Sequence, residues 1–113
     1  MPPRDPEDDK LVTLARGARG RVGAPQGAAV RDDTGRTYSA ASVALPSLAI
    51  SALRLAVAQA TASGARGLEC AVLAADSPGA DDDDLAAVRD LGGAGVPVIV
   101  VDRRGDELAR LTT

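Results

Sequence analysis

Apolar residues along this chain change their spacing several times, and each spacing predicts a different element. Two continuous apolar runs, residues 68–75 and 96–101, are typical of strands covered on both faces of a sheet. Residues 27–31 and 36–43 flank an Asp-Asp-Thr-Gly sequence that favours a turn, so they predict a hairpin. A last strand is expected over residues 107–111.

Three segments are expected to be helical. The first runs to about residue 20, with Asp8 or Asp9 as its N-cap. One face of it carries four apolar side chains: Leu11, Leu14, Ala15 and Ala18. The second, residues 46–63, begins at a proline and is apolar nearly all round, as in a helix buried in a domain centre or at a subunit contact. The third, residues 84–91, has acidic residues at its positive end.

The predicted order of elements is α-β-β-α-β-α-β-β. This order indicates an α/β fold in which a mixed sheet of about five strands lies between helices. Residues 1–9 are rich in proline and aspartate and are expected to form a loose leader. Residues 10–113 contain no internal repeat or linker, so a single domain is expected there.

The composition limits the chemistry that the chain can perform. Its 113 residues include no histidine and one cysteine, Cys70. A zinc site of nitrogen and sulfur ligands needs three or four such residues, and Ser-His-Asp or Cys-His catalysis needs an imidazole. Neither kind of site can be assembled within this chain. The position of Cys70 inside an apolar strand predicts a buried structural thiol.

Charge and hydropathy argue against a nucleic-acid-binding, membrane-spanning or secreted protein. The net charge of −3 argues against general nucleic-acid binding. No apolar run approaches the ~20 residues that cross a bilayer, and the first ten residues lack the apolar region of a secretory signal. We therefore expect a cytoplasmic protein without membrane contact. The frequent Ala, Gly, Arg and Asp suit a GC-rich bacterial genome.

The hydrophobic core is expected to be aliphatic, because Tyr38 is the one aromatic residue in the sequence. Small side chains bury little area each, and a core of this kind often gains stability from a partner surface. A homo-oligomer is therefore expected.

Two charged clusters are candidates for ligand contacts. Arg16, Arg19 and Arg21 could touch a phosphate, although a solvated helix face is favoured. Four successive aspartates, residues 81–84, could bind a divalent cation. They lack the alternating ligands and the closing glutamate of a calcium loop, so a solvated helix start is favoured.

The order and spacing of these segments resemble the cytidine deaminase family. Residues 27–30 look like that family's first strand, residues 33–38 like its hairpin turn, and residues 48–57 like the helix that carries its first zinc motif. Residues 68–76 and 96–105 look like the next two strands. The resemblance covers nearly the whole predicted domain and implies the family's three-layer α/β/α fold.

The resemblance also implies a chemistry. Enzymes of the family deaminate cytidine by hydrolysing a C–N bond in nucleoside metabolism. A zinc-bound water, with a pKa near ~7, attacks C4 of cytosine, and a glutamate that is not a ligand moves the protons. A Cys-Ala-Glu or His-Ala-Glu triplet supplies one ligand and that glutamate. A Pro-Cys-x-x-Cys motif at a helix start supplies two thiolates.

In this sequence the motif positions carry other residue types. The first ligand position is Ser51 and the acid/base position is Leu53. The proline position of the second motif is Asp84, and its two cysteine positions are Leu85 and Val88. We therefore expect no catalytic residue, no metal ligand and no bound zinc, with aliphatic side chains packed across the place of the metal.

The family's ribose contacts precede the first motif. The corresponding region here contains Ser42 and Ala44 and is about two residues shorter than in the family, so no substrate contact is assigned to it.

Two hypotheses follow. The first is a non-catalytic cytidine deaminase-like protein that keeps the fold and serves as a binding or scaffolding oligomer, a dimer or tetramer. The alternative is a divergent nucleoside deaminase that works without zinc or is completed by a partner, such as a paralogous deaminase subunit. Identical chains would add only further copies of Cys70, so a homomeric zinc site is not expected.

Overall fold

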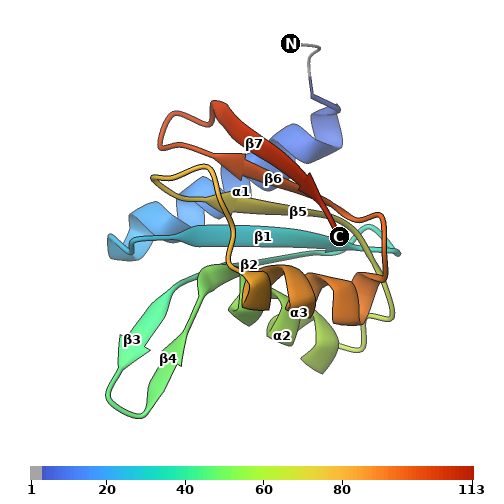
Figure 1. Ribbon diagram of the computed structural model, residues 1–113, viewed down its shortest axis with the longest axis horizontal. Helices are drawn as coiled ribbons and strands as arrows, with labels where there is room; N and C mark the ends of the chain where they lie inside the picture. The colour runs from blue at the N-terminus through green and yellow to red at the C-terminus, as the bar shows by residue number, and fades with distance from the viewer. Residues whose placement is uncertain (1–3) are drawn as a thin grey trace.

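The computed structural model describes residues 4–113, and its centre is a five-stranded sheet in the order β2-β1-β5-β6-β7 (Figure 1). The strands are β1 (Gly27–Asp32), β2 (Thr37–Ala41), β5 (Leu68–Ala74), β6 (Pro97–Val101) and β7 (Glu107–Thr112). The β5–β6 pair is parallel and the other neighbours are antiparallel, so the sheet is mixed, as predicted.

Helices cover both faces of this sheet. The helix α1 (Pro6–Val22) lies on one face, and α2 (Ala52–Ala62) and α3 (Asp82–Gly92) lie on the other (Figure 1). Strand β6 shows why two faces are needed: Val98 and Val100 join the core under α2 and α3, whereas Ile99 and Val101 join the core under α1. Successive side chains of a strand point to opposite faces, so an unbroken apolar run requires cover on both. The predicted α/β/α fold is confirmed.

The predicted helix over residues 46–63 is wrong in its first part. Residues 43–50 form a separate hairpin of β3 (Val43–Leu45) and β4 (Leu48–Ile50), which projects from the body (Figure 1). Pro46 lies in the turn of this hairpin, where a fixed φ is as suitable as in a helix. The helix α2 begins only after Ser51, whose hydroxyl caps it. The predicted order of elements therefore lacked these two short strands.

The predicted loose leader over residues 1–9 is also wrong in part. The helix α1 begins at Pro6, because Asp5 is its N-cap and accepts a hydrogen bond from the amide of Glu7 at 2.8 Å. It ends at Val22 rather than near residue 20. Residues 1–3 of the predicted leader lie outside the described residues.

The helix α1 packs closely on β1 because Gly27 has no side chain. A Cβ atom at this position would lie 2.7 Å from the Cβ of Arg19 and would collide with the carbonyl oxygen of Ala15. The approach of helix and strand buries Leu11, Ala15 and Ala29 completely. Within residues 4–113, no helix has both the length and the apolar character that crossing a bilayer requires.

Candidate functional site

The N-termini of α2 and α3 meet on one side of the sheet. Ser51, the N-cap of α2, donates a hydrogen bond from Oγ to Oδ1 of Asp84 at 2.5 Å, and the same Oγ accepts one from the amide of Arg54 at 3.3 Å. Asp84 lies in the first turn of α3, a favourable place for a carboxylate. The fold thus joins the two segments on which the motif positions of the resemblance fall.

Aliphatic side chains surround this polar pair. Leu53 and Val88 are fully buried, and Leu85 packs against the same core with part of its side chain exposed. Asp84 itself is only 1% exposed. At the junction a partly buried hydroxyl is therefore in contact with a buried carboxylate.

These side chains do not fit the ligand set of a zinc ion. A catalytic zinc site takes three protein ligands from Cys, His, Asp or Glu, and the positions Ser51, Leu85 and Val88 offer a single hydroxyl. Asp84 adds one carboxylate that already accepts the Ser51 hydrogen bond. Among residues 4–113, His, Cys, Asp and Glu side chains form no group of three or more that could hold a metal ion.

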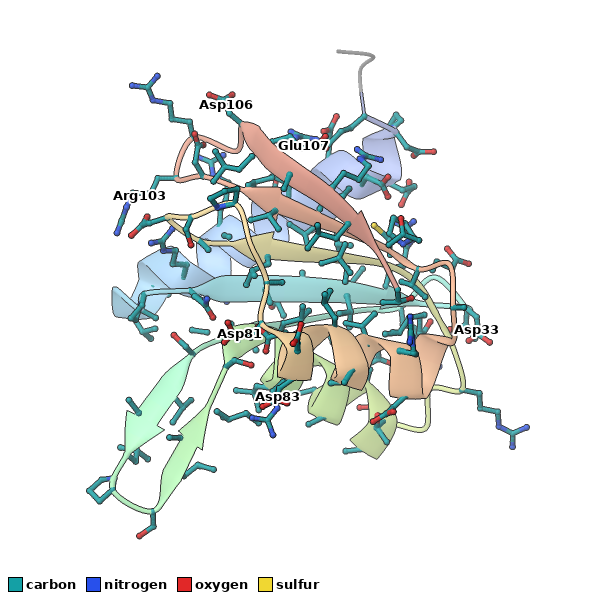
Figure 2. The ribbon with its side chains drawn as sticks, in the orientation of Figure 1. Asp33, Asp81, Asp83, Arg103, Asp106 and Glu107 are labelled. Atoms are coloured by element: carbon teal, nitrogen blue, oxygen red, sulfur yellow. The ribbon has the colours of Figure 1, made fainter. Side chains whose placement is uncertain are left out.

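The burial of Asp84 is a feature that sequence reasoning missed. A solvated helix start was expected for the four aspartates, and Asp81, Asp82 and Asp83 are indeed exposed at the start of α3 (Figure 2). The helix begins two residues earlier than predicted, at Asp82, and this start directs Asp84 inward. A signal was present, because Asp84 precedes Val88 by one turn and so shares its buried face.

The region aligned with the ribose contacts has other roles here. Ser42 follows β2, where its Oγ donates to the carbonyl of Gln26 at 3.4 Å and accepts from the amide of Gln26 at 3.3 Å. Ala44 pairs with Ala49 inside the projecting hairpin and is exposed. The hydroxyl of Ser42 therefore holds the ends of β1 and β2 together.

Cys70 lies on the opposite side of the sheet, in the core beneath α1, and is 1% exposed. Burial raises the pKa of its thiol to about 12, with a further rise from the nearby Asp8 carboxylate. The predicted buried thiol is confirmed, and a group with this pKa supplies almost no thiolate at neutral pH.

The hairpin turn between β1 and β2 contains a second buried carboxylate, Asp32. Burial acts to raise its pKa, but hydrogen bonds from the Thr34 and Tyr38 hydroxyls and from the amides of Thr34 and Arg36 lower it to about 2. A hollow of about 490 Å³ lies beside this turn, at the C-terminal end of α2 and so at the opposite end of that helix from Ser51. The four hydrogen bonds give Asp32 a structural role in closing the turn.

A family model described as cytidine deaminase-like matches residues 4–105. The chain belongs to the cytidine deaminase-like family. No curated protein matches the chain.

Three solved structures resemble this member of the family. The cytidine deaminase from Burkholderia pseudomallei aligns with a TM-score of 0.77 at 22% identity, over 93% of this chain and 90% of that one. The cytidine deaminase from Mycobacterium leprae aligns with a TM-score of 0.72 at 22% identity, over 96% and 94%. A mutant cytidine deaminase from Mycobacterium tuberculosis aligns with a TM-score of 0.71 at 20% identity, over 83% and 85%. At these identities the likeness is one of fold alone.

Proposed function

We propose that this chain is a non-catalytic member of the family that keeps the deaminase fold and acts in the cytoplasm as a binding or scaffolding oligomer. One observation carries the proposal. Where the resemblance places a zinc ligand and a proton-transferring glutamate, Ser51 is bonded to Asp84, and Leu53 is fully buried beside them.

The chemistry of deamination supports this proposal. Without a metal, the pKa of water stays far above neutral, whereas the zinc enzymes need a hydroxide near neutral pH. General acid–base assistance is worth roughly 10²- to 10⁴-fold in rate, and the leucine at position 53 cannot exchange a proton. Asp84 is the remaining acid at the junction, and a side chain that is 1% exposed cannot reach a substrate without rearrangement.

The proposal is tested by metal analysis and a cytidine absorbance assay on the purified protein. A Ser51→Ala variant prepared in parallel is the matched control, because it removes the one hydroxyl at the junction. We expect less than stoichiometric zinc and equal, background turnover in both preparations. One zinc per chain, or turnover of the parent protein above that of a mock preparation from cells with an empty vector, would overturn the proposal.

The alternative, a deaminase completed by a partner, is favoured by one observation. The projecting hairpin ends at Ile50, directly before Ser51, so a partner that docks on it would lie beside the junction. Affinity purification from the native host separates the two functions. Recovery of a paralogous subunit that carries the zinc motif would support the alternative, and recovery of this chain alone would support the scaffold.

A further inference from the structure

A basic cavity of about 200 Å³ lies on the opposite side of the sheet from Ser51 and Asp84. Three arginines line it: Arg16 and Arg19 from α1, and Arg103 from the turn after β6. Its floor includes Ala74, the last residue of β5. The cavity is therefore at the carboxyl ends of the two parallel strands, an edge at which α/β proteins commonly bind ligands.

Arg19 is the buried member of this group, and the prediction of a solvated arginine face is wrong for it. The residue is 4% exposed. Its Nε donates to the carbonyl of Ala24 at 3.2 Å, and its Nη2 donates to Oδ1 of Asp76 at 2.8 Å. Among the described residues, its buried Nη1 has no hydrogen-bond acceptor. A buried donor without an acceptor costs free energy, and the residue that carries this donor also lines the cavity.

The other two arginines add positive charge at the mouth of the cavity. Arg16 donates from Nε to the carbonyl of Arg103 at 3.0 Å, which joins α1 to the β6–β7 turn. Arg103 lies at the outer edge of that turn (Figure 2), and its Nε is 3.5 Å from Oδ1 of Asp76. Asp102 in the same turn accepts hydrogen bonds from the amides of Arg104 and Asp106.

The charges that line and adjoin the cavity leave an excess of positive charge. The residues that line it include three arginines and no acidic residue, while two carboxylates adjoin it: Asp76, which is two-thirds exposed, and Asp102. The hydrogen bond from Arg19 lowers the pKa of Asp76, so this carboxylate is ionised at neutral pH. Three guanidinium groups against two carboxylates leave an excess of one positive charge, which favours an anionic ligand.

There is also room for a ligand. A Cβ atom at Gly20 or at Gly23 would meet no atom within 4 Å, so the wall formed by the end of α1 is open. The carbonyl of Arg19, in the last turn of α1, already accepts from the amides of Gly23 and Ala24, which reduces its repulsion of an anion.

We propose that this cavity binds a phosphate group, either as free phosphate or as a phosphate monoester. Guanidinium groups match phosphate oxygens with paired hydrogen bonds, and such charge-assisted bonds are about twice as strong as neutral ones. A bound phosphate would give Arg16, Arg19 and Arg103 a shared acceptor. It would tie α1 to the β6–β7 turn, at a place separate from the α2–α3 junction.

Calorimetric titration at constant ionic strength tests the proposal, with inorganic phosphate in one arm and glycerol 3-phosphate in the other. We expect saturable binding in at least one arm, which also identifies the source of the phosphate group. Arg103→Gln should weaken binding about tenfold or more, because it removes one charge-assisted donor. Arg104→Gln is the matched control on the same turn and should bind as the parent does.

A second variant is expected to strengthen phosphate binding, a result that a misfolded protein would not give. Asp76→Asn removes the carboxylate that competes for Arg19 and Arg103 and should tighten binding severalfold. The absence of saturable binding in both arms would overturn the proposal. Equal losses in the Arg103 and Arg104 variants would overturn it as well, because they would indicate general charge attraction.

Discussion

At the scale of single residues, two buried carboxylates account for most of the polar interior. Asp84 and Asp32 are 1% and 2% exposed, and each accepts a hydrogen bond from a side-chain hydroxyl. A buried charge is tolerated only when it is hydrogen-bonded. Their partners come from different distances along the chain: Thr34 and Tyr38 are local to Asp32, whereas Ser51 is 33 residues from Asp84.

Replacing Ser51 by alanine should destabilise the protein. The change removes a helix cap, worth about 1 kcal/mol, and a hydrogen bond to a charged group, worth about 1.5–3 kcal/mol. We expect a loss of about 2–4 kcal/mol in urea unfolding at pH 7. Ser47→Ala, in the exposed hairpin turn, is the control and should change the free energy of unfolding by less than about 0.5 kcal/mol. Equal effects of the two changes would contradict a stabilising hydrogen bond between Ser51 and Asp84.

Asp32 should make the protein sensitive to acid. Its pKa falls from the ordinary 3.8 to about 2 on folding, so its carboxylate stabilises the fold above pH 3.8. That contribution should be lost as the pH falls from about 4 to about 2, because the proton then binds the unfolded chain first. Urea unfolding at a series of pH values measures it. Asp32→Asn should flatten the dependence in this window, and Asp33→Asn, at an exposed neighbour, should leave it unchanged.

At the scale of elements, the distance between a helix and the sheet depends on the side chains at their contact. Strand β1 contacts α1 on one face and α2 on the other, and the absence of a side chain at Gly27 permits the contact with α1. The sequence alone does not identify this glycine among the 12 in the chain.

Gly27→Ala should therefore force α1 away from the sheet. Overpacking of this kind costs roughly 1–3 kcal/mol, and a clash with backbone belongs at the upper end. Gly20→Ala is the control within α1, where a Cβ atom meets nothing within 4 Å. This second change should be neutral or should stabilise the helix by up to about 1 kcal/mol. Thermal unfolding of both variants checks the prediction, and equal stability would contradict the observed packing.

At the scale of the whole molecule, the projecting hairpin presents two exposed leucines side by side. Leu45 and Leu48 are paired across its turn and are 58% and 54% exposed. The sequence left open whether the all-round apolar helix is buried in the domain centre or at a subunit contact, and α2 buries Leu53, Ala56 and Ala60 in the core of the domain. We therefore propose that copies of this chain contact one another through the exposed leucines of the hairpin.

Light scattering after size exclusion should give a mass of two or four chains for the parent protein. The double change Leu45→Glu with Leu48→Glu places charges in the proposed contact and should yield monomers without loss of fold. Leu14→Glu, at a partly exposed site on α1, is the matched control and should keep the parent mass. A monomeric parent protein would refute the oligomer.

The sequence by itself determined the layers, the five strands of the central sheet and the kinds of side chain available. Unbroken apolar runs such as residues 96–101 need cover on both faces, and a chain without histidine has few ligands for zinc. Tertiary structure decided the turn at Pro46, the burial of Asp84 and the burial of Arg19. Proline suits a turn and a helix start equally, and a charge becomes buried only when a distant partner meets it. Arg19 donates a hydrogen bond to Asp76, which is 57 residues away, and the spacing of apolar and polar residues around Arg19 does not predict such a contact.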